Sequence, residues 1–379
     1  MASDLMDLHL KYRVFDWLRF PLIVGVVFIH SFGKPYDYEA IDFCHFTAID
    51  FYNLFRVSIS FVLTHVCVPV FFFISGYLFF KGLEIWDNRN YLQKIRRRMK
   101  TLLVPFLLWN TIKIILYLKY AIHHGLWDVI QSFLYNNGFF HLYWDCIQWN
   151  LGRTNWLGVP TPASSPFLVT LWFLRDLMVV VICSPVLYFL FDKAKKWGIL
   201  LLLVCYLSGV FINVPGFSTT AFLFFGLGGY FKINDIDPIQ VMYKYRYYAF
   251  IIALITWISC TLWNGHETEI GNLIYPFYVL SGSVTTINLA GYMVRNNLMS
   301  FLCHPLLSKG AFFIYLSHTL FFIEFYTKVS LFCFGEDNPF LLIISYLIVP
   351  VLTILTCLLL YFILKMVFPS ICSILTGER

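Results

Sequence analysis

The first apolar stretch of the chain carries three ionisable side chains, Asp16, Arg19 and His30. If residues 14–33 form a helix with ~100° per residue, the steps from Arg19 to His30 complete three turns plus ~20°, so both side chains lie on one face, ~16 Å apart along the axis. Asp16 lies one turn before Arg19 on the same face. Histidine is the side chain best suited to remove a proton from a hydroxyl near neutral pH. The stretch therefore predicts acid–base chemistry, with His30 as the candidate general base and Asp16 orienting or neutralising Arg19.

The same three residues also have a structural interpretation. Asp16 and Arg19 would form an ion pair, and His30 would lie at a wet interface or bond a backbone carbonyl. Ionisable groups inside a membrane segment are rare, however, and usually face a cavity or a partner. Three such residues aligned on one face favour a functional role.

Polar residues also interrupt later apolar runs. His65 lies at an outer depth similar to that of His30, where it either shares the base role or is structural. His318 either faces a pore or forms a bond between helices. Ser75 either hydrogen-bonds within a pore or, beside Gly76, serves helix packing.

The fourth apolar run contains Trp172 and the adjacent pair Arg175 and Asp176. Charges near the middle of a span require a partner or a water-filled cavity. Adjacent helical residues point ~100° apart, so Arg175 and Asp176 need not pair with each other. Four residues are candidates for substrate binding: His65, Trp172, Arg175 and His318.

The elements that must position these residues are membrane helices. Of the 379 residues, 59% are hydrophobic and only 13% charged, which lies outside the usual range for soluble domains. A span needs about 20 mostly apolar residues. Ten windows qualify: roughly 14–33, 58–80, 99–120, 166–191, 197–213, 217–233, 247–264, 271–293, 309–333 and 340–367. We expect an all-α, polytopic integral-membrane helical bundle with about ten transmembrane helices, forming a single domain over residues 1–379.

The distribution of charge predicts how this bundle is oriented. Lys and Arg are retained on the cytoplasmic side of a membrane. Seven of them lie between residues 81 and 100, whereas the alternate connections are acidic or nearly uncharged, with Asp37, Glu39 and Asp42 after the first run. Both termini are therefore expected in the cytoplasm. The outer connection 121–165 holds Trp144, Trp149 and Trp156, which suit an interfacial belt or a platform for sugar rings.

Composition and motifs disfavour several classes of protein. The net charge of +6 comes mostly from short basic segments between apolar runs, so it does not indicate nucleic-acid binding. The ten cysteines are scattered, without CxxC or a metal-like Cys/His spacing, so no metal site is expected. Neither GxGxxG nor GxxxxGK[ST] occurs.

An ordered set of segments resembles the membrane acyltransferase type 3 family. The set comprises Arg19 and His30 with ten residues between them, FFFISGYLFF, KIRRRMKTLLVP, LWFLRDL, FLFFGLGGYF and IYLSH. It extends from residue 16 to about residue 318, and its order is more specific than any one segment. The soluble esterase-like domain that some family members add is missing from this chain.

The resemblance implies transfer of an acyl group, commonly acetyl from acetyl-CoA, to hydroxyls of sugars in surface glycans or other exported molecules. It places Arg19 and His30 in the catalytic apparatus and the basic segment at the entrance for acyl-CoA. The expected location is the cell membrane, as a multi-pass protein of the bacterial inner membrane. The family's basic motif is often an arginine pair spaced by three. Arg97 and Lys100 have this spacing, and so do Lys94 and Arg97.

Elementary chemistry agrees with this assignment. Acyl-CoA carries phosphates, for which a cationic cluster is a suitable docking surface. The candidate cofactor-binding residues are Arg96, Arg97, Arg98 and Lys100, together with Ser75. The alternative for the cluster is ordinary retention of positive charge on the cytoplasmic side. The ~16 Å between Arg19 and His30 is comparable to an extended pantetheine arm, so a thioester could reach the outer side.

A second function class is a transporter or flippase that moves a glycan, glycolipid or acyl group without transfer chemistry. Such a protein would also use buried charges, but would more often show paired, interrupted helices in two halves. The sequence does not identify the sugar acceptor. Release of CoA in proportion to acylated product distinguishes the enzyme from the transporter.

Overall fold

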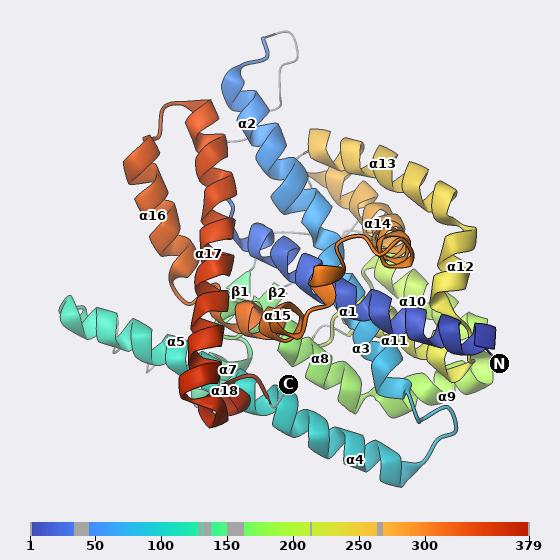
Figure 1. The fold of residues 1–379 in the computed structure, drawn as a ribbon. Helices are drawn as coiled ribbons and strands as arrows, with labels where there is room; N and C mark the ends of the chain where they lie inside the picture. Colours follow the sequence, from blue (N-terminus) through green and yellow to red (C-terminus); the bar gives the residue numbers. More distant parts are fainter. Residues whose placement is uncertain are drawn as a thin grey trace. The chain divides into compact units, whose positions relative to one another are not determined.

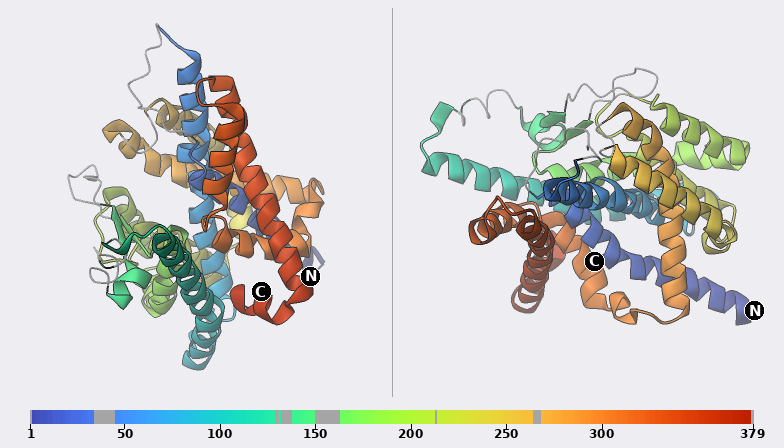
Figure 2. Two further views of the ribbon diagram at one scale, coloured as in Figure 1. Left: turned by 90° about the vertical axis from the view of Figure 1, so that its left-hand side faces the viewer. Right: turned by 90° about the horizontal axis from the view of Figure 1, so that it is seen from above.

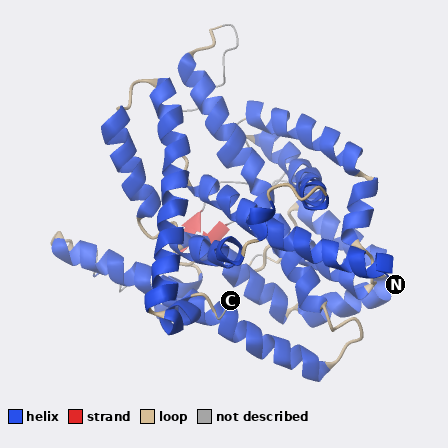
Figure 3. Cartoon of the chain, viewed as in Figure 1, coloured by secondary structure: helices blue, strands red, loops and turns tan. Residues whose placement is uncertain are grey.

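The computed structural model describes residues 2–33, 45–128, 131, 138–149, 163–212, 214–263 and 268–377. Nearly all of these residues lie in helices, as Figure 3 shows. The exception is a two-stranded antiparallel ribbon of β1 (Ile147–Trp149) and β2 (Ala163–Ser165), in which Ile147 pairs with Ser165. The helical fold class predicted from the sequence is confirmed. Asp37, Glu39, Asp42 and Trp156 lie outside the described residues.

The chain divides into two compact units. The first unit contains Met1–Ser75 and Asn234–Phe362, and the second contains Gly76–Ile233 and Ile363–Arg379. Two helices, α3 (Cys67–Phe80) and α17 (Pro339–Val367), contribute residues to both units.

The first unit is built around α1 (Ala2–His30), which continues through Pro21 without a break. Thr47 and Asp50 form a reciprocal capping box at the start of α2, which fixes where that helix begins. Figures 1 and 2 show α13 beside α14 and α16 beside α17. The remaining elements of this unit are α2 (Ala48–Arg56), η1 (Val57–Val62), η2 (Leu63–Val66), α12 (Pro238–Lys244), α13 (Arg246–Leu262), α14 (Glu269–Arg295), η5 (Ser300–Cys303), α15 (Pro305–Ser317) and α16 (Phe322–Phe334).

The second unit packs α3 tightly against α11. A Cβ at Gly76 would overlap the carbonyl oxygen of Phe225, so only glycine permits this approach of the two helices. The other elements are α4 (Asn88–Arg98), η3 (Met99–Leu103), α5 (Val104–His123), α7 (Phe139–Trp144), η4 (Val169–Leu171), α8 (Trp172–Ile182), α9 (Ser184–Ala194), α10 (Lys196–Ser208), α11 (Thr219–Ile233) and α18 (Pro369–Leu375).

Within the described residues, four continuous helices are long and apolar enough to cross a membrane: Ala48–Phe80, Asn88–His123, Glu269–Arg295 and Pro339–Val367. Three bent pairs raise the number to seven if each pair is one span, namely α8 with α9, α12 with α13, and α15 with α16. All ten predicted windows overlap described helices, but α1 carries Arg13, Asp16 and Arg19, and α10 and α11 have only 13 and 15 residues. The expected count of about ten therefore stays a prediction.

Among the described residues of the first unit, helical geometry is irregular in the span Ala48–Phe80 and at two bends, one of which is the 71° bend between α12 and α13. The span Ala48–Phe80 passes through a π-helical turn, η1, and a 3₁₀ turn, η2, before α3 begins. Further along the chain, α15 and α16 meet at an angle of 81° across residues 318–321. Departures of this kind from regular helix often mark functional positions in membrane proteins.

Candidate functional site

Helix α1 holds the three ionisable residues of the first apolar stretch. Because the helix is continuous from Ala2 to His30, Arg19 and His30 keep the three-turn spacing expected from the sequence. Arg19 Nε lies 3.1 Å from Asp16 Oδ1, and both side chains are roughly half-exposed. The predicted pairing of Asp16 with Arg19 is thus present, and His30 is the last residue of the helix.

His30 lies against His318, a residue from the far end of the sequence. Their ring centroids are 5.3 Å apart, and the ring planes are inclined by 49°. His318 is fully buried, whereas His30 is partly buried. His318 directly follows α15, where the chain bends towards α16. The structure therefore brings two of the predicted site residues together.

The hydrogen bonding of His318 defines its tautomer. Its Nδ1 lies 2.9 Å from the carbonyl oxygen of Ile314, which also accepts the backbone N–H of His318 at 3.0 Å. A carbonyl oxygen only accepts, so Nδ1 carries the proton and the neutral ring has a lone pair on Nε2. Nε2 is buried and has no hydrogen-bond partner among the described residues. The ring can therefore accept a proton at Nε2.

The third predicted histidine, His65, lies in the 3₁₀ turn η2 of the same unit. Its Nδ1 is 2.6 Å from the hydroxyl of Tyr275, and the two rings meet edge to face at 5.6 Å. The turn η2 packs against α1, the helix that ends at His30. Among the residues that the structure describes, no group of His, Cys, Asp or Glu has the arrangement of a metal site.

A hydrogen-bonded network holds the carboxyl end of α1. Ser60 donates to the carbonyl of Phe28 at 2.6 Å and lies 2.7 Å from the hydroxyl of Tyr346. Arg56 donates to the carbonyl of Phe32 at 3.4 Å, just past His30. The sequence reasoning missed Arg56. A signal was present in the charge pattern. Arg56 is a basic residue in the connection after the first apolar run, where four acidic residues outnumber the basic ones and predict an outer location.

The basic residues predicted to bind acyl-CoA lie in the second unit, on α4 and η3. Arg96, Arg97 and Lys100 are exposed and Arg98 is partly so. Lys94 donates to the carbonyl of Lys81 at 2.7 Å and lies over the Phe79 ring, so it already has a structural role. Both members of the pair Arg97 and Lys100 are exposed, whereas Lys94 is partly buried.

Ser75 is the last residue of the first unit and is partly buried in α3. Its neighbour Gly76 makes the close approach to α11 described above, which supports the helix-packing interpretation of this pair.

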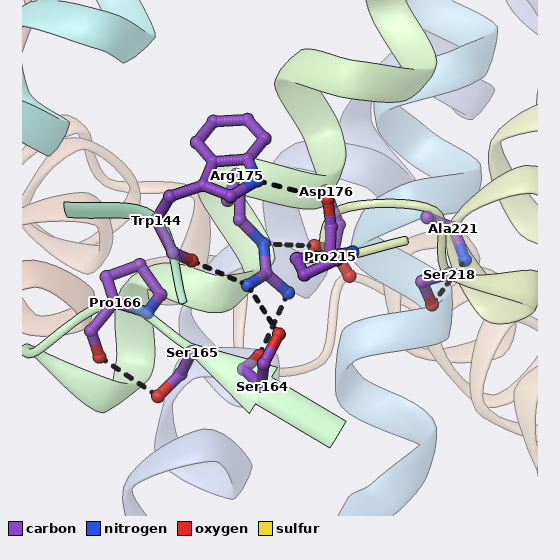
Figure 4. Close-up of polar contacts among 9 residues, drawn as sticks. All are labelled: Trp144, Ser164, Ser165, Pro166, Arg175, Asp176, Pro215, Ser218 and Ala221. Carbon is purple, nitrogen blue, oxygen red and sulfur yellow. Dashed lines mark hydrogen bonds and ion pairs between the residues drawn. The ribbon is translucent and has the colours of Figure 1, made fainter. Parts of the chain in front are cut away.

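Arg175 in the second unit is extensively bonded within the protein, as Figure 4 shows. Its Nη1 donates to the Trp144 carbonyl at 2.8 Å and to Ser164 Oγ at 3.1 Å, and its Nη2 donates to the Ser164 carbonyl at 2.9 Å. Nε lies 2.9 Å from Oδ1 of Asp176, so the adjacent residues do pair. Arg175 lies in the first turn of α8, and it ties α8 to α7 and β2. Trp172 begins the same helix and is partly buried.

The sequence-predicted residues thus fall into two groups. The first unit contains Asp16, Arg19, His30, His65, Ser75 and His318. Within it, His30 and His318 are in contact, and the turn that carries His65 packs against α1. The basic cluster, Trp172 and Arg175 belong to the second unit. The first group has the composition of an acid–base site, and the second that of an anion-docking surface and a structural clamp.

Comparison with protein families agrees with this chemistry. The family described as an acyltransferase domain, of type 3, matches residues 12–362. The chain belongs to this family. The match includes both histidines of the contact, the Asp16–Arg19 pair and the basic cluster. Together with the apolar helices, membership identifies a membrane protein.

One similar protein is the "Succinoglycan biosynthesis protein ExoH" of Rhizobium meliloti (strain 1021), which is 29% identical over 202 residues. The alignment covers 52% of this chain and 48% of the relative, so the chain spans about half the length of the curated relative it matches. No solved structure matches this chain.

Proposed function

We propose that this protein is an integral-membrane O-acyltransferase that transfers acetyl from cytoplasmic acetyl-CoA to a hydroxyl of a surface polysaccharide, glycolipid or other sugar acceptor. Family membership supports acyl transfer, and the name of the relative supports a polysaccharide acceptor. The observation that carries the proposal is the contact of His30 with His318, whose Nε2 is buried without a partner among the described residues.

In the proposed reaction, His30 removes the proton of the acceptor hydroxyl as its oxygen attacks the thioester carbonyl carbon. The C–S bond then breaks, and the imidazolium returns the proton to the departing CoA thiolate. His318 supports this exchange because its Nε2 lone pair can accept a hydrogen bond or a proton from the reacting groups. The bond to Ile314 holds the ring in this state.

The other predicted residues have proposed supporting roles. Asp16 holds Arg19 by their ion pair, and Arg19 faces the arm of acyl-CoA. Arg96, Arg97, Arg98 and Lys100 bind the phosphates of CoA, with Ser75 along the path of the donor. His65 and Trp172 contact the sugar acceptor, whereas Arg175 positions the β1–β2 ribbon and affects the acceptor only through it.

The proposed arrangement in the membrane follows the charge pattern. The whole chain acts as one transmembrane acyltransferase domain of about ten spans in a bacterial inner membrane, with both termini in the cytoplasm. The donor enters from the cytoplasm, and the acceptor meets the thioester near the outer surface. Labelling of single cysteines introduced at each connection measures this topology directly.

Purified protein in lipid nanodiscs, incubated with labelled acetyl-CoA and candidate sugars, tests the activity. The enzyme releases CoA in proportion to acylated sugar, whereas a transporter releases none. Sealed vesicles of known orientation test sidedness, because acetyl-CoA should work only from the cytoplasmic face and a membrane-impermeant acceptor only from the other. Reaction with both substrates confined to the cytoplasmic face would contradict the cross-membrane mechanism.

A further inference from the structure

Arg56 is a buried cation beside the end of α1. It is only 5% exposed, and its Nη1 and Nη2 donate to the Phe32 carbonyl and to Asn53 Oδ1, each at 3.4 Å. Its Nε has no hydrogen-bond partner among the described residues. Both bonds are long, and both acceptors are neutral.

Other buried cations of this chain have carboxylate partners. Lys11 Nζ lies 3.4 Å from Asp237, and Arg175 Nε lies 2.9 Å from Asp176. For Arg56, no carboxylate of the described residues lies within ion-pair distance. Its guanidinium carbon lies 5.5 Å from the centroid of the Phe61 ring. A buried charge without a counter-charge is costly, so this guanidinium is suited to receive an anion.

A second polar group without a partner lies at the same end of α1. The hydroxyl of Ser31 is buried and has no hydrogen-bond partner among the described residues. Ser31 lines a cavity about the size of one water molecule, together with Gly33, Ser345 and Tyr346. Gly33 lines this cavity and also lies beside Arg56, because a Cβ built on Gly33 would lie 3.5 Å from Arg56 Cδ.

We propose that Arg56 and the Ser31 hydroxyl bind a carboxylate of the substrate beside His30. This inference rests on the proposed acyl transfer and specifies which substrates it favours. The planar guanidinium matches two carboxylate oxygens, and a cavity of this size admits one of them more readily than a tetrahedral phosphate. The carboxylate belongs either to a dicarboxylic acyl group, beyond the thioester, or to an acidic sugar of the acceptor.

A purely structural role for Arg56 is the competing explanation. The carboxyl end of a helix carries partial negative charge, which a nearby cation stabilises. Loss of such a cap would lower stability and reduce activity equally for neutral and acidic substrates. If Arg56 instead binds a carboxylate, its replacement should lower the activity with acidic substrates more than the activity with neutral ones.

The binding experiment uses purified full-length protein in detergent. Thermal unfolding is measured with succinate, with methyl β-D-glucuronide, with methyl β-D-glucoside and with inorganic phosphate. At least one carboxylate should raise the melting temperature of the wild type, the glucoside should not, and Arg56→Gln should abolish the rise. Arg56→Lys keeps the charge without the planar fork and should give a smaller rise, and it replaces the glutamine variant if that one does not fold.

Two activity arms distinguish the sources of the carboxylate. The first compares succinyl-CoA with acetyl-CoA as donor, and the second compares the glucuronide with the glucoside as acceptor. In one arm, Arg56→Gln should reduce the preference for the acidic substrate by about 10- to 100-fold in kcat/KM, as expected for a charged hydrogen bond. Ser60→Ala, which disturbs the same end of α1 without changing charge, should keep the preference.

The binding measurements test the carboxylate site independently of the proposed acyl transfer. Carboxylate-dependent stabilisation that vanishes in Arg56→Gln supports the site even if no transfer is detected. The site is ruled out by any of three results: no stabilisation of the wild type by either carboxylate, a larger effect of phosphate, or an acidic preference that survives in Arg56→Gln.

Discussion

Two regions of the molecule place ionisable side chains among apolar helices. They differ in whether the buried polar atoms of those side chains have hydrogen-bond partners. In the second unit, Arg175 uses all three of its nitrogens in bonds to Asp176, Trp144 and Ser164. In the first unit, His318 Nε2, Arg56 Nε and Ser31 Oγ are buried without partners among the described residues. The second unit has a buried hydroxyl of this kind at Ser184, but its buried arginine is fully bonded. A network in which every polar atom is hydrogen-bonded stabilises a fold. A buried polar atom without a partner is available to hydrogen-bond a substrate.

The comparison predicts its largest effect at His30. His30→Ala should reduce acyl transfer by about 10²- to 10⁴-fold, the usual contribution of a general base. Expression and membrane insertion should stay near normal, and His123→Ala, which changes an exposed histidine, should retain activity. Turnover is measured as labelled acyl group incorporated per molecule of protein. Near-wild-type turnover of His30→Ala would move the base role to His65 or His318.

The opposite behaviour is expected at Arg175. Arg175→Met should destabilise the protein by about 3–5 kcal/mol, because it leaves the buried carboxylate of Asp176 without its cation. Turnover per folded molecule should change little. Thermal unfolding and activity measured on the same sample check both parts.

The double variant Arg175→Met/Asp176→Asn provides the control for this prediction. It removes both charges, and it should recover part of the lost stability. A fall in turnover with unchanged melting temperature in Arg175→Met would instead indicate direct substrate binding by this arginine.

The variant His318→Asn tests the role of His318 Nε2, which has no hydrogen-bond partner among the described residues. The asparagine amide can still donate to the Ile314 carbonyl, but the variant lacks the Nε2 position. Activity should fall by about 10²-fold, at the lower end of the range for a proton-transfer group, while the melting temperature stays within a few degrees of the wild type. Equal losses of stability and activity would make His318 a packing residue.

The smallest effect is expected from the exposed cations of the second unit. Replacing Arg97, Arg98 and Lys100 with glutamine should raise the KM for acyl-CoA about tenfold and change kcat little, because neighbouring cations share the binding of phosphate. Lys193, Lys195 and Lys196 provide a matched control of three basic residues after another span. If both triple variants leave the KM unchanged, the cluster has only a topological role.

The helices could be predicted from the sequence because long apolar runs leave few alternatives. The window 340–367 nearly coincides with α17, and 271–293 lies within α14. Helix α4 (Asn88–Arg98) lies mostly in a segment predicted as a connection, because a hydropathy pattern does not detect a polar helix. Asp87, its N-capping residue, is the signal for this helix in the sequence. The bend at residues 318–321 could not be predicted, because this segment contains neither proline nor glycine.

The sequence predicted those features of the site that depend on spacing within one helix. Helical periodicity aligned Asp16, Arg19 and His30, and the ion pair followed from their spacing. The contact of His30 with His318 depends on which helices pack together, which periodicity within one helix does not specify. The pairing of Arg175 with Asp176 depends on side-chain torsions, and these allow Nε to reach Oδ1 although the two Cβ atoms point apart.

The carbonyl of Ile314 accepts both the backbone and the ring of His318, so the imidazole is fixed to its own helix. A freely rotating side chain would lose conformational entropy each time it reached a reactive orientation. Here that loss occurs once, when the protein folds, and the lone pair on Nε2 has a constant direction through every catalytic cycle. Movement of the imidazole therefore requires movement of the end of α15, which lies beside the 81° bend to α16.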